Sequence, residues 1–487
     1  MAKIPQNQQF FSNFEPGRKS LRIGVIGAGS SGLTALKALK DRGFSPICFE
    51  IGSDIGGLWV LKNKNGRGGA YRSLHINTST TEMEFSDFPM RRDIGDFPSH
   101  TEMAAYFLAY AQKFDLLSAI HFNQEVVHCR PLSAEESVKD ECTGYALTIR
   151  DRVTGSTTST HLDALIVANG HHWSPAFSQP RPHNKYLGTI LHATEYISPS
   201  EPHDLVGKRV LVVGMGNSAM DIAYELSRQG IADHVSVSVR RGAWVLPKYI
   251  LGKPFDQGTF IPTWLPAQLR RRLVTASFRL LFGKMSDYGL PEPDHLIGEA
   301  HPTVSSRFPQ AVKNGELAMQ DKIASFSGKH VHFSNGIIHD FDAIIYCTGY
   351  NIKFPFFDEG HIEAPQNRLG LYFRAFHPMH RRVFFVGLAQ TIGAIMPVAE
   401  AQSRAIAAHL DGEYALPTSD EMQEQIRRDE GEMAARFVPS PRHSMQVDPH
   451  VFHARLRKDM ARGKKRARKG FGISFPVVPR KSHSQLS

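Results

Sequence analysis

The sequence predicts an α/β fold of two units, each built on a parallel sheet, with the second unit inserted into the first. Two glycine-rich turns point to this fold, because each follows an apolar strand pattern and opens a helical one. The length agrees with this fold. A chain of 487 residues with 41% hydrophobic content is too long for one hydrophobic core and suits two or three. The first unit would be completed by chain that returns after about residue 330.

The first unit opens at residues 21–50, LRIGVIGAGSSGLTALKALKDRGFSPICFE, where an apolar strand meets three spaced glycines. Gly27 permits a tight turn, Gly29 lets the backbone approach a pyrophosphate, and Gly32 lets the helix pack closely on the strand. The free N–H groups and the dipole at the start of that helix favour a phosphate there. Glu50 ends the next strand, where an acid can accept hydrogen bonds from a ribose. This order of elements predicts a dinucleotide site.

The second unit opens at residues 208–230, KRVLVVGMGNSAMDIAYELSRQG, with a second Rossmann-like turn. Its small residues at the same spacing are Gly214, Gly216 and Ala219. The strand that follows ends in Arg240 and Arg241, where the first unit has Glu50. A guanidinium can hold a 2′-phosphate by charge-assisted bonds, whereas an acid would repel it. We therefore expect NADPH rather than NADH on this unit, with an exposed basic pair as the alternative.

The strand patterns also divide the chain. Residues 163–172 and 340–350 are short strands that end in small-residue turns, at the sheet edge where ligands bind. Residues 245–310 resist an alternating pattern, and within them 264–283 could lie on a membrane, line a tunnel or form an amphipathic covering helix. The predicted parts are an N-terminal extension (1–20), the first unit (21–185 and 331–415), the second unit (186–330) and a C-terminal extension with a basic tail (416–487).

The net charge of +10 is concentrated in the basic tail. Eleven Lys or Arg lie between Arg455 and Lys481 against the single acid Asp459, so the rest of the chain is neutral overall. Such a tail suits RNA, anionic lipid or nuclear import. A solvated and partly disordered end also explains it, because blocks of like charge repel.

The sequence indicates neither a metal site nor a dithiol relay. The pair His171 and His172 follows a turn but brings no third ligand. No apolar run reaches the about 18 residues of a bilayer span, so we expect a cytoplasmic protein, with peripheral membrane association left open. The cysteines form no CxxC pair and lie far apart, at Cys48, Cys129, Cys142 and Cys347.

Further segments resemble the flavin-containing monooxygenase family, of the dimethylaniline monooxygenase type, over most of residues 20–410. Those segments are GGLW at 56–59, LHINTSTTEMEFSDFP at 74–89, YLGTILHATEY at 186–196, EAHPTVSSRF at 299–308 and VGLAQTIGAIMPVAEAQSR at 386–404. The third carries the family's identifying pattern at Tyr186, Gly188, His192 and Tyr196, with Tyr in place of the usual Phe at the first position. Related Baeyer–Villiger enzymes usually have Trp where this chain has Tyr196, so the match favours oxygenation of heteroatoms.

The resemblance implies FAD on the first unit and NADPH on the second, inserted unit. In the family, hydride from NADPH reduces the flavin and dioxygen adds to give a C4a-hydroperoxyflavin. A soft nitrogen or sulfur atom of a small molecule then attacks the distal oxygen, so no Ser, Cys or His nucleophile is required. Ketone oxygenation of the Baeyer–Villiger type stays open, as do a nucleotide-binding redox sensor or NADPH oxidase, and a homodimer.

The same resemblance places Asn77 beside the flavin as the catalytic residue, where its amide could hydrogen-bond the peroxide or the nicotinamide. Turn capping by Asn77 is the alternative. We expect His192 to join the two units and orient NADPH rather than act as a base, and Cys347 to be buried filler. Further cofactor contacts are expected from Ser31, Gly57, Leu58, Trp59, Thr78, Asn217, Ser218, Thr348 and Gln390, with a core or loop role open for Trp59 and Gln390.

Overall fold

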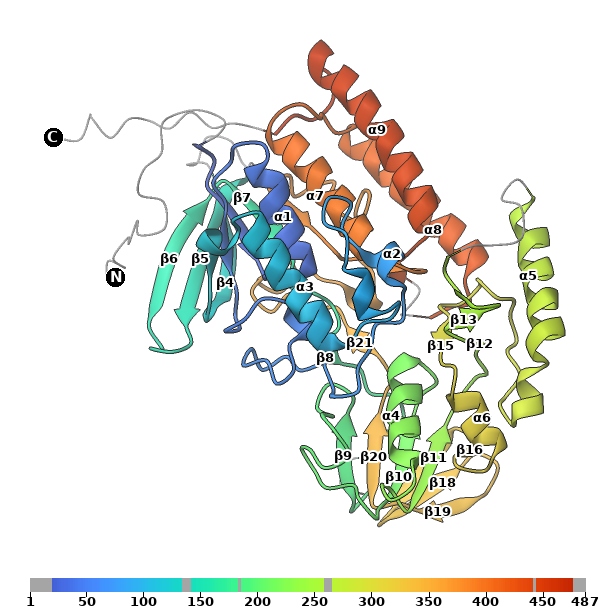
Figure 1. The fold of residues 1–487 in the computed structure, drawn as a ribbon. Helices are drawn as coiled ribbons and strands as arrows, with labels where there is room; N and C mark the ends of the chain where they lie inside the picture. The colour runs from blue at the N-terminus through green and yellow to red at the C-terminus, as the bar shows by residue number, and fades with distance from the viewer. Residues whose placement is uncertain (1–19, 134–141, 183–184, 258–264, 441–443, 476–487) are drawn as a thin grey trace.

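The computed structural model describes residues 20–133, 142–182, 185–257, 265–440 and 444–475 (Figure 1). Two five-stranded parallel sheets organise these residues, with the second sheet below the first unit in Figure 1. The predicted α/β class of two parallel-sheet units is therefore confirmed. The predicted N-terminal extension lies outside the described residues except for Ser20, and so does the end of the basic tail, 476–487.

The first sheet has helices on one face and an antiparallel sheet on the other. Its strand order is β22 (Val383–Phe385), β7 (Ala164–Val167), β1 (Ile23–Ile26), β2 (Ile47–Phe49) and β3 (Ile120–His121). The covering elements are helices α1 (Ser30–Lys40), α3 (His100–Lys113) and α7 (Met396–Leu410), and strands β4 (Gln124–Ser133), β5 (Cys142–Asp151) and β6 (Thr157–Leu162). Val25 joins the helix-side core and Ile26 the opposite one. A parallel sheet buried on both faces requires such continuous apolar strands.

The second sheet repeats this three-layer plan. Its strand order is β16 (Ala318–Gln320), β11 (His234–Ser238), β10 (Arg209–Val213), β20 (Ala343–Tyr346) and β9 (Thr189–His192). Helices α4 (Asn217–Ser227) and α6 (Phe308–Lys313) pack on one face, and strands β17 (Ile323–Ser327), β18 (His330–Phe333) and β19 (Ile338–Asp340) on the other. Each sheet therefore has its own pair of cores.

Strand β20 belongs to the second sheet, because it pairs in parallel with β10 on one side and β9 on the other. The boundary predicted at residue 330 is therefore wrong, since the chain rejoins the first sheet only at β22. The strand pattern in 340–350 carries no sign of its partner, because a buried apolar strand fits the middle of either sheet.

The insertion predicted at 245–310 holds short strand pairs and one long helix. The pairs are β12 (Val245–Leu246) with β15 (Thr303–Val304) and β13 (Tyr249–Ile250) with β14 (Lys253–Pro254). Helix α5 (Ala267–Phe282) stands at the edge of the molecule, and only Thr275 and Phe278 of its residues are buried (Figure 1). None of its residues lines the cavity described below, so the alternative of α5 as a tunnel wall is wrong for that cavity.

The C-terminal extension folds onto the first unit. Helices α8 (Ser419–Arg436) and α9 (Pro449–Lys469) follow α7, and strand β24 (Gln446–Val447) pairs with β23 (Gln390–Thr391). Phe452 and Leu456 of α9 are buried in the first unit's core. A Cβ at Gly463 would lie 2.1 Å from the ring of Tyr414, so α9 packs closely against the segment that follows α7. Residues 455–469 of the basic tail thus belong to a docked helix, so for them the interpretation as a partly disordered end is wrong, although most of their cations are exposed to solvent.

The cations of α9 lie mainly on its outer face. Arg455 pairs with Asp429 and Arg466 with Asp459. Within the described ranges, seven further cations are exposed and form no ion pair: Arg457, Lys458, Arg462, Lys464, Lys465, Arg468 and Lys469. The described part of the chain includes no helix with both the length and the apolar content needed to cross a bilayer.

Candidate active site

A cavity of about 990 Å³ lies between the carboxyl ends of the two parallel sheets. It is at the upper end of the about 300–1,000 Å³ typical of ligand pockets, at the sheet edge where ligands of such folds bind. Of the predicted site residues, Gly32 and Ala219 lie behind its wall. Those that line it are Gly27, Gly29, Ser31, Glu50, Gly57, Leu58, Trp59, Asn77, Thr78, His192, Gly214, Gly216, Asn217, Ser218, Arg240, Arg241, Thr348 and Gln390.

The first glycine turn is too tight for side chains. Gly27 has φ +101°, and a Cβ there would lie 2.7 Å from the carbonyl oxygen of Ala168. A Cβ at Gly32 would lie 1.8 Å from the carbonyl oxygen of Gly27, so helix and strand can meet only through glycine. The backbone of Gly29 faces that of Gly57, with a built Cβ 3.8 Å from its Cα. Helix α1 has no side-chain cap and no acid in its first turn, which leaves its N–H groups to an anion.

Glu50 is held by the backbone of its own unit. Its carboxylate accepts hydrogen bonds from the N–H groups of Ala28, at 2.6 Å, and Gly52, at 2.7 Å. Burial raises the pKa of this acid, while the two N–H bonds oppose the rise. The remaining lone pairs can accept from ribose hydroxyls, so the first turn and Glu50 fit the pyrophosphate and sugar of a dinucleotide.

The second glycine turn is tied to the insertion. The Asn217 side-chain oxygen accepts from the N–H of Val304 at 2.8 Å, and the Thr303 hydroxyl donates to the carbonyl of Met215 at 2.8 Å. The amide N–H₂ of Asn217 remains as a donor toward the cavity. Helix α4 also starts without a side-chain cap or an acid in its first turn, so it fits a second phosphate.

The two arginines after β11 differ in their surroundings. Arg241 donates to Asp294 at 2.7 Å and lies beside a small hollow next to the main cavity. Arg240 is exposed and, among the described residues, pairs with no acid. Arg240 is therefore the arginine that is available to a 2′-phosphate, while Arg241 is engaged by a carboxylate.

Asn77 projects from the loop that precedes α2 (Thr80–Met83). The surrounding backbone is fixed, because the N–H of Ile76 donates to Pro98 and that of Ser79 to the Asp256 carboxylate, at 2.7 Å. In the described part of the chain the Asn77 amide makes no hydrogen bond, so it caps no turn there. A partly buried amide at the cavity wall is left with two donors and an acceptor for a ligand.

His192 is buried at the cavity and carries no charge at neutral pH. Its Nδ1 accepts from the N–H of Thr194 at 3.2 Å, so Nε2 holds the proton and donates to the carbonyl of Gly349 at 3.1 Å. The side chain is fully buried, and burial lowers the pKa of His192 to about 4. Both nitrogens are engaged at neutral pH, and the expectation that His192 joins the two units and orients NADPH stays a prediction. The neighbouring Thr348 hydroxyl donates to the carbonyl of Ala176, which holds the same turn.

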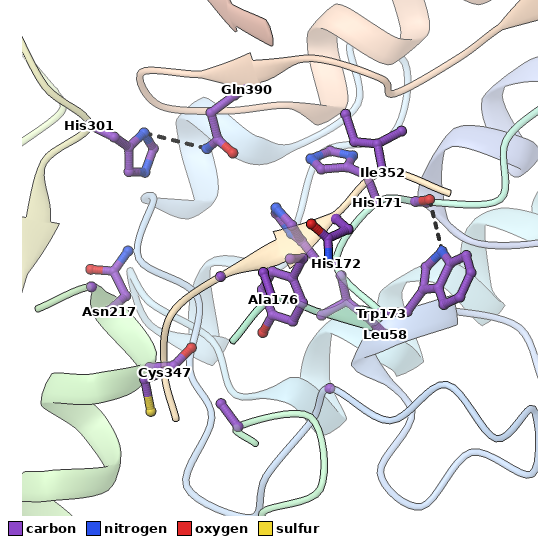
Figure 2. A pocket seen from close by; sticks show the side chains of 18 of the residues that line it. Leu58, His171, His172, Trp173, Ala176, Asn217, His301, Cys347, Ile352 and Gln390 are labelled. Carbon is purple, nitrogen blue, oxygen red and sulfur yellow. Dashed lines mark hydrogen bonds between the residues drawn. The ribbon is translucent and has the colours of Figure 1, made fainter. Parts of the chain in front are cut away.

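The far end of the cavity includes residues that the sequence did not indicate. His301 Nδ1 and Gln390 Nε2 face each other at 3.4 Å, as Figure 2 shows. The C-terminal extension supplies the wall there, through Val438, Pro439, Ser440 and Met445. The appendage predicted from composition is thus part of the site, since the pairing of β23 with β24 carries it past Gln390. His301 lies in one of the family-like segments, and that was the one available signal.

Cys347 lines the cavity as a free thiol. Burial raises its pKa, so the thiol is protonated at neutral pH, and no disulfide involves it. Across the described ranges no group of three or more His, Cys, Asp or Glu could hold a metal ion. Trp59 lines the cavity and also packs on the first unit's core, and its role as a cofactor contact stays a prediction.

The chain matches the model of the family described as flavin-binding monooxygenase-like over residues 20–459. Flavin-containing monooxygenase 5 of Oryctolagus cuniculus is 33% identical over 456 residues, with 88% of this chain and 80% of the relative covered. Dimethylaniline monooxygenase [N-oxide-forming] 2 of the same species is 33% identical over 445 residues, with the same coverage.

Two solved structures share the fold. The S-allyl-L-cysteine S-oxygenase of Allium sativum superposes with a TM-score of 0.65 at 22% identity, covering 93% of this chain and 89% of that one. The cyclohexanone monooxygenase of Rhodococcus sp. Phi1 bound to NADP+ gives 0.65 at 16% identity, covering 91% and 98%. These likenesses extend over both sheets and the extension that follows them.

Proposed function

The chain belongs to the flavin-binding monooxygenase-like family and is a flavin-dependent monooxygenase that uses FAD and NADPH, and we propose that it oxygenates soft nitrogen or sulfur atoms of small molecules. The observation that carries the proposal is the position of Asn77. Its unengaged amide lies on a cavity that includes both glycine turns. The names of an N-oxide-forming relative and of an S-oxygenase with this fold support nitrogen or sulfur as the target.

The first unit would hold FAD and the second unit NADPH. The α1 N-terminus and Gly29 would bind a pyrophosphate, and Glu50 a ribose; the α4 N-terminus and Arg240 would bind the phosphates of the second nucleotide. When bound, the flavin supplies the electron transfer and the oxygen activation, by the route that the family resemblance implies.

The chain's own residues would then hold the reactive oxygen and keep water out. The Asn77 Nδ2 donors can hold a partly negative oxygen, which delays its loss as hydrogen peroxide. The apolar side chains of Val438, Pro439 and Met445 exclude water at the far end of the cavity. Gln390, held against His301, can orient a polar substrate there.

The test measures NADPH consumption and peroxide release with methimazole, trimethylamine and a cyclic ketone. We expect the two amine or sulfur substrates to be oxygenated and the ketone to be left unchanged. Asn77→Ala should divert at least half of the NADPH to peroxide while flavin stays bound, because one oxygen-holding donor contributes about 10²-fold. Asn314→Ala is the matched control and should behave like wild type. Asn314 is exposed at the end of α6, and its amide donates to the Glu316 carboxylate.

Other outcomes identify other functions. Conversion of the ketone to an ester would favour the Baeyer–Villiger alternative. NADPH oxidation that no substrate accelerates, with peroxide as the sole product, would favour a redox sensor or NADPH oxidase and overturn the proposal.

We propose in addition that the outer face of α9 contacts an anionic lipid surface. Seven exposed cations lie there without ion pairs in the described structure, and the apolar side of α9 is buried, so contact would be electrostatic and sensitive to salt. Replacing Lys464, Lys465 and Lys469 by Gln should release the protein from phosphatidylserine vesicles without changing turnover. Equal retention of both proteins would overturn this, and preferential retention on RNA would assign a nucleic acid instead.

A further inference from the structure

Helix α4 carries two acids that bond hydroxyl groups of two other segments of the chain. Asp221 accepts a hydrogen bond from the Tyr71 hydroxyl at 2.7 Å. Glu225, one turn further along, accepts from the hydroxyls of Ser73, at 2.9 Å, and Tyr196, at 2.8 Å. Three hydroxyl groups from two other segments therefore donate hydrogen bonds to the acids of one helix.

The first of these segments is the loop 71–78, which contains Asn77. Its start is anchored by Tyr71 and Ser73 on α4 and by the N–H of Arg72, which donates to the carbonyl of Ile197 at 2.8 Å. The loop lines the cavity at Tyr71 and again from Leu74 to Thr78. The place of Asn77 relative to the second unit therefore depends on what holds the start of the loop.

The second segment is the connector that follows β9, where Tyr196 lies. Tyr196 is almost fully buried, and its ring packs at 6.2 Å from that of Tyr71. Its hydroxyl shares the Glu225 oxygen with Ser73. The last residue of the family's identifying pattern is thus bonded to the helix of the second unit.

Helix geometry links these contacts to the second nucleotide site. Asn217, Asp221 and Glu225 are spaced by four residues, so they lie along one face of α4. Asn217 is in the turn that faces the cavity, and the two acids follow it one and two turns on. A shift of α4 would move the phosphate-binding turn and the anchors of the Asn77 loop together.

We propose that Asp221 and Glu225 are positioning residues that fix Asn77 relative to the nicotinamide nucleotide on α4. Stability alone is a weak reason for them, because apolar side chains of similar size usually pack there at lower cost than acids taken out of water. Hydrogen bonds to carboxylates are directional and strong, so they can hold two segments in register. The proposal rests on the role proposed for Asn77.

The test compares acids with apolar and amide replacements. Asp221→Leu and Glu225→Leu remove the acceptor, whereas Asp221→Asn and Glu225→Gln keep one. We expect each Leu variant to weaken NADP+ binding by about threefold or more in equilibrium titration and to raise the peroxide share of NADPH turnover, since small misplacements are costly in such sites. The amide variants should recover most of both properties. Tyr196→Phe, which does not line the cavity, should resemble Glu225→Leu in a weaker form.

Tyr106→Phe is the control for loss of a buried hydroxyl. Tyr106 donates to the carbonyl of Phe88 and accepts from the N–H of Phe85 in the first unit's core, away from the cavity. It should lower the unfolding temperature and leave NADP+ affinity and coupling unchanged. If the Leu variants behave like this control, or if the amide variants are no better than the Leu variants, the two acids are structural and the proposal is overturned. The NADP+ affinities of the variants test the positioning role even if no substrate is oxygenated. A lack of substrate oxygenation would contradict the proposed function and not the positioning role.

Discussion

The two glycine turns of this protein share the same spacing of small residues, but they differ in whether the third position accepts a side chain. At the third small position the first turn has Gly32 and the second has Ala219, which is fully buried. A Cβ at Gly32 would collide with the backbone of Gly27, whereas the second turn contains a Cβ at the same position. The first helix therefore sits closer to its strand than a methyl group allows, and the second does not.

The residues that we expect at each nucleotide's sugar also differ. Glu50 is buried and already bonded to two backbone N–H groups, so its position is set before any ligand binds. Arg240 is exposed and has no acid partner among the described residues, and Arg241 is engaged by Asp294. We therefore expect the first site to hold its nucleotide tightly and the second to exchange its own.

The largest effect is expected from exchanging the third position. Gly32→Ala should give colourless protein without FAD, because the new Cβ would lie 1.8 Å from the Gly27 carbonyl oxygen and the backbone must move. Ala219→Gly should keep NADP+ affinity within about threefold, since it removes only helix propensity, about 1 kcal/mol. Flavin absorbance and an NADP+ titration measure both. A Gly32→Ala protein with a full complement of FAD would show that the two turns are equally tolerant.

A smaller effect is expected at the arginines. Arg240→Ala should raise the Kd for NADP+ about 10- to 100-fold, which corresponds to about 1.5–3 kcal/mol for a charged hydrogen bond, and leave that for NAD+ nearly unchanged. Arg241→Ala should cost NADP+ less, because Asp294 already occupies that guanidinium. Isothermal titration with both nucleotides measures this. Equal losses for NADP+ and NAD+ would mean that neither arginine reads the 2′-phosphate.

Local sequence signals were enough to predict the two glycine turns and many of the residues that line the cavity. The strand, glycine and helix order located both turns, and the family-like segments include Asn77, His192 and Gln390, which all line the cavity. Their roles as cofactor or catalytic contacts stay predictions. The family, the fold class and the two cofactors are confirmed.

What the sequence missed depends on long-range pairing. The assignment of β20 to the second sheet follows from pairing with β9, which precedes it by about 150 residues, and no local pattern encodes that choice. The docking of α9 was visible in principle, since Phe452, Leu456 and Gly463 share one helical face, but its charges dominated the composition. The contribution of Met445 to the cavity required that docking to be known.

The smallest expected effect is a pH dependence of stability, which should distinguish Asp221 in the second unit from Glu50 in the first. Burial raises the pKa of Asp221 to about 6, with one hydroxyl opposing it, whereas two N–H groups oppose the rise at Glu50. Because an unfolded Asp titrates near 3.9, folded protein binds the extra proton between about pH 4 and 6. The contribution of Asp221 to stability is therefore fully present below pH 4 and is lost as the pH rises to 6.

Asp221→Asn should remove that dependence, because the amide keeps an acceptor for Tyr71 and cannot ionise. Tyr71, Glu225, Lys248 and His75 face Asp221 in both proteins, so the difference between them isolates its carboxyl group. Relative to the variant, wild type should gain about 2–4 °C in unfolding midpoint on going from pH 7 to 4.5, about 1 kcal/mol after allowance for partial exposure. Parallel midpoint profiles would mean that Asp221 titrates like an exposed acid and that the contrast with Glu50 is absent.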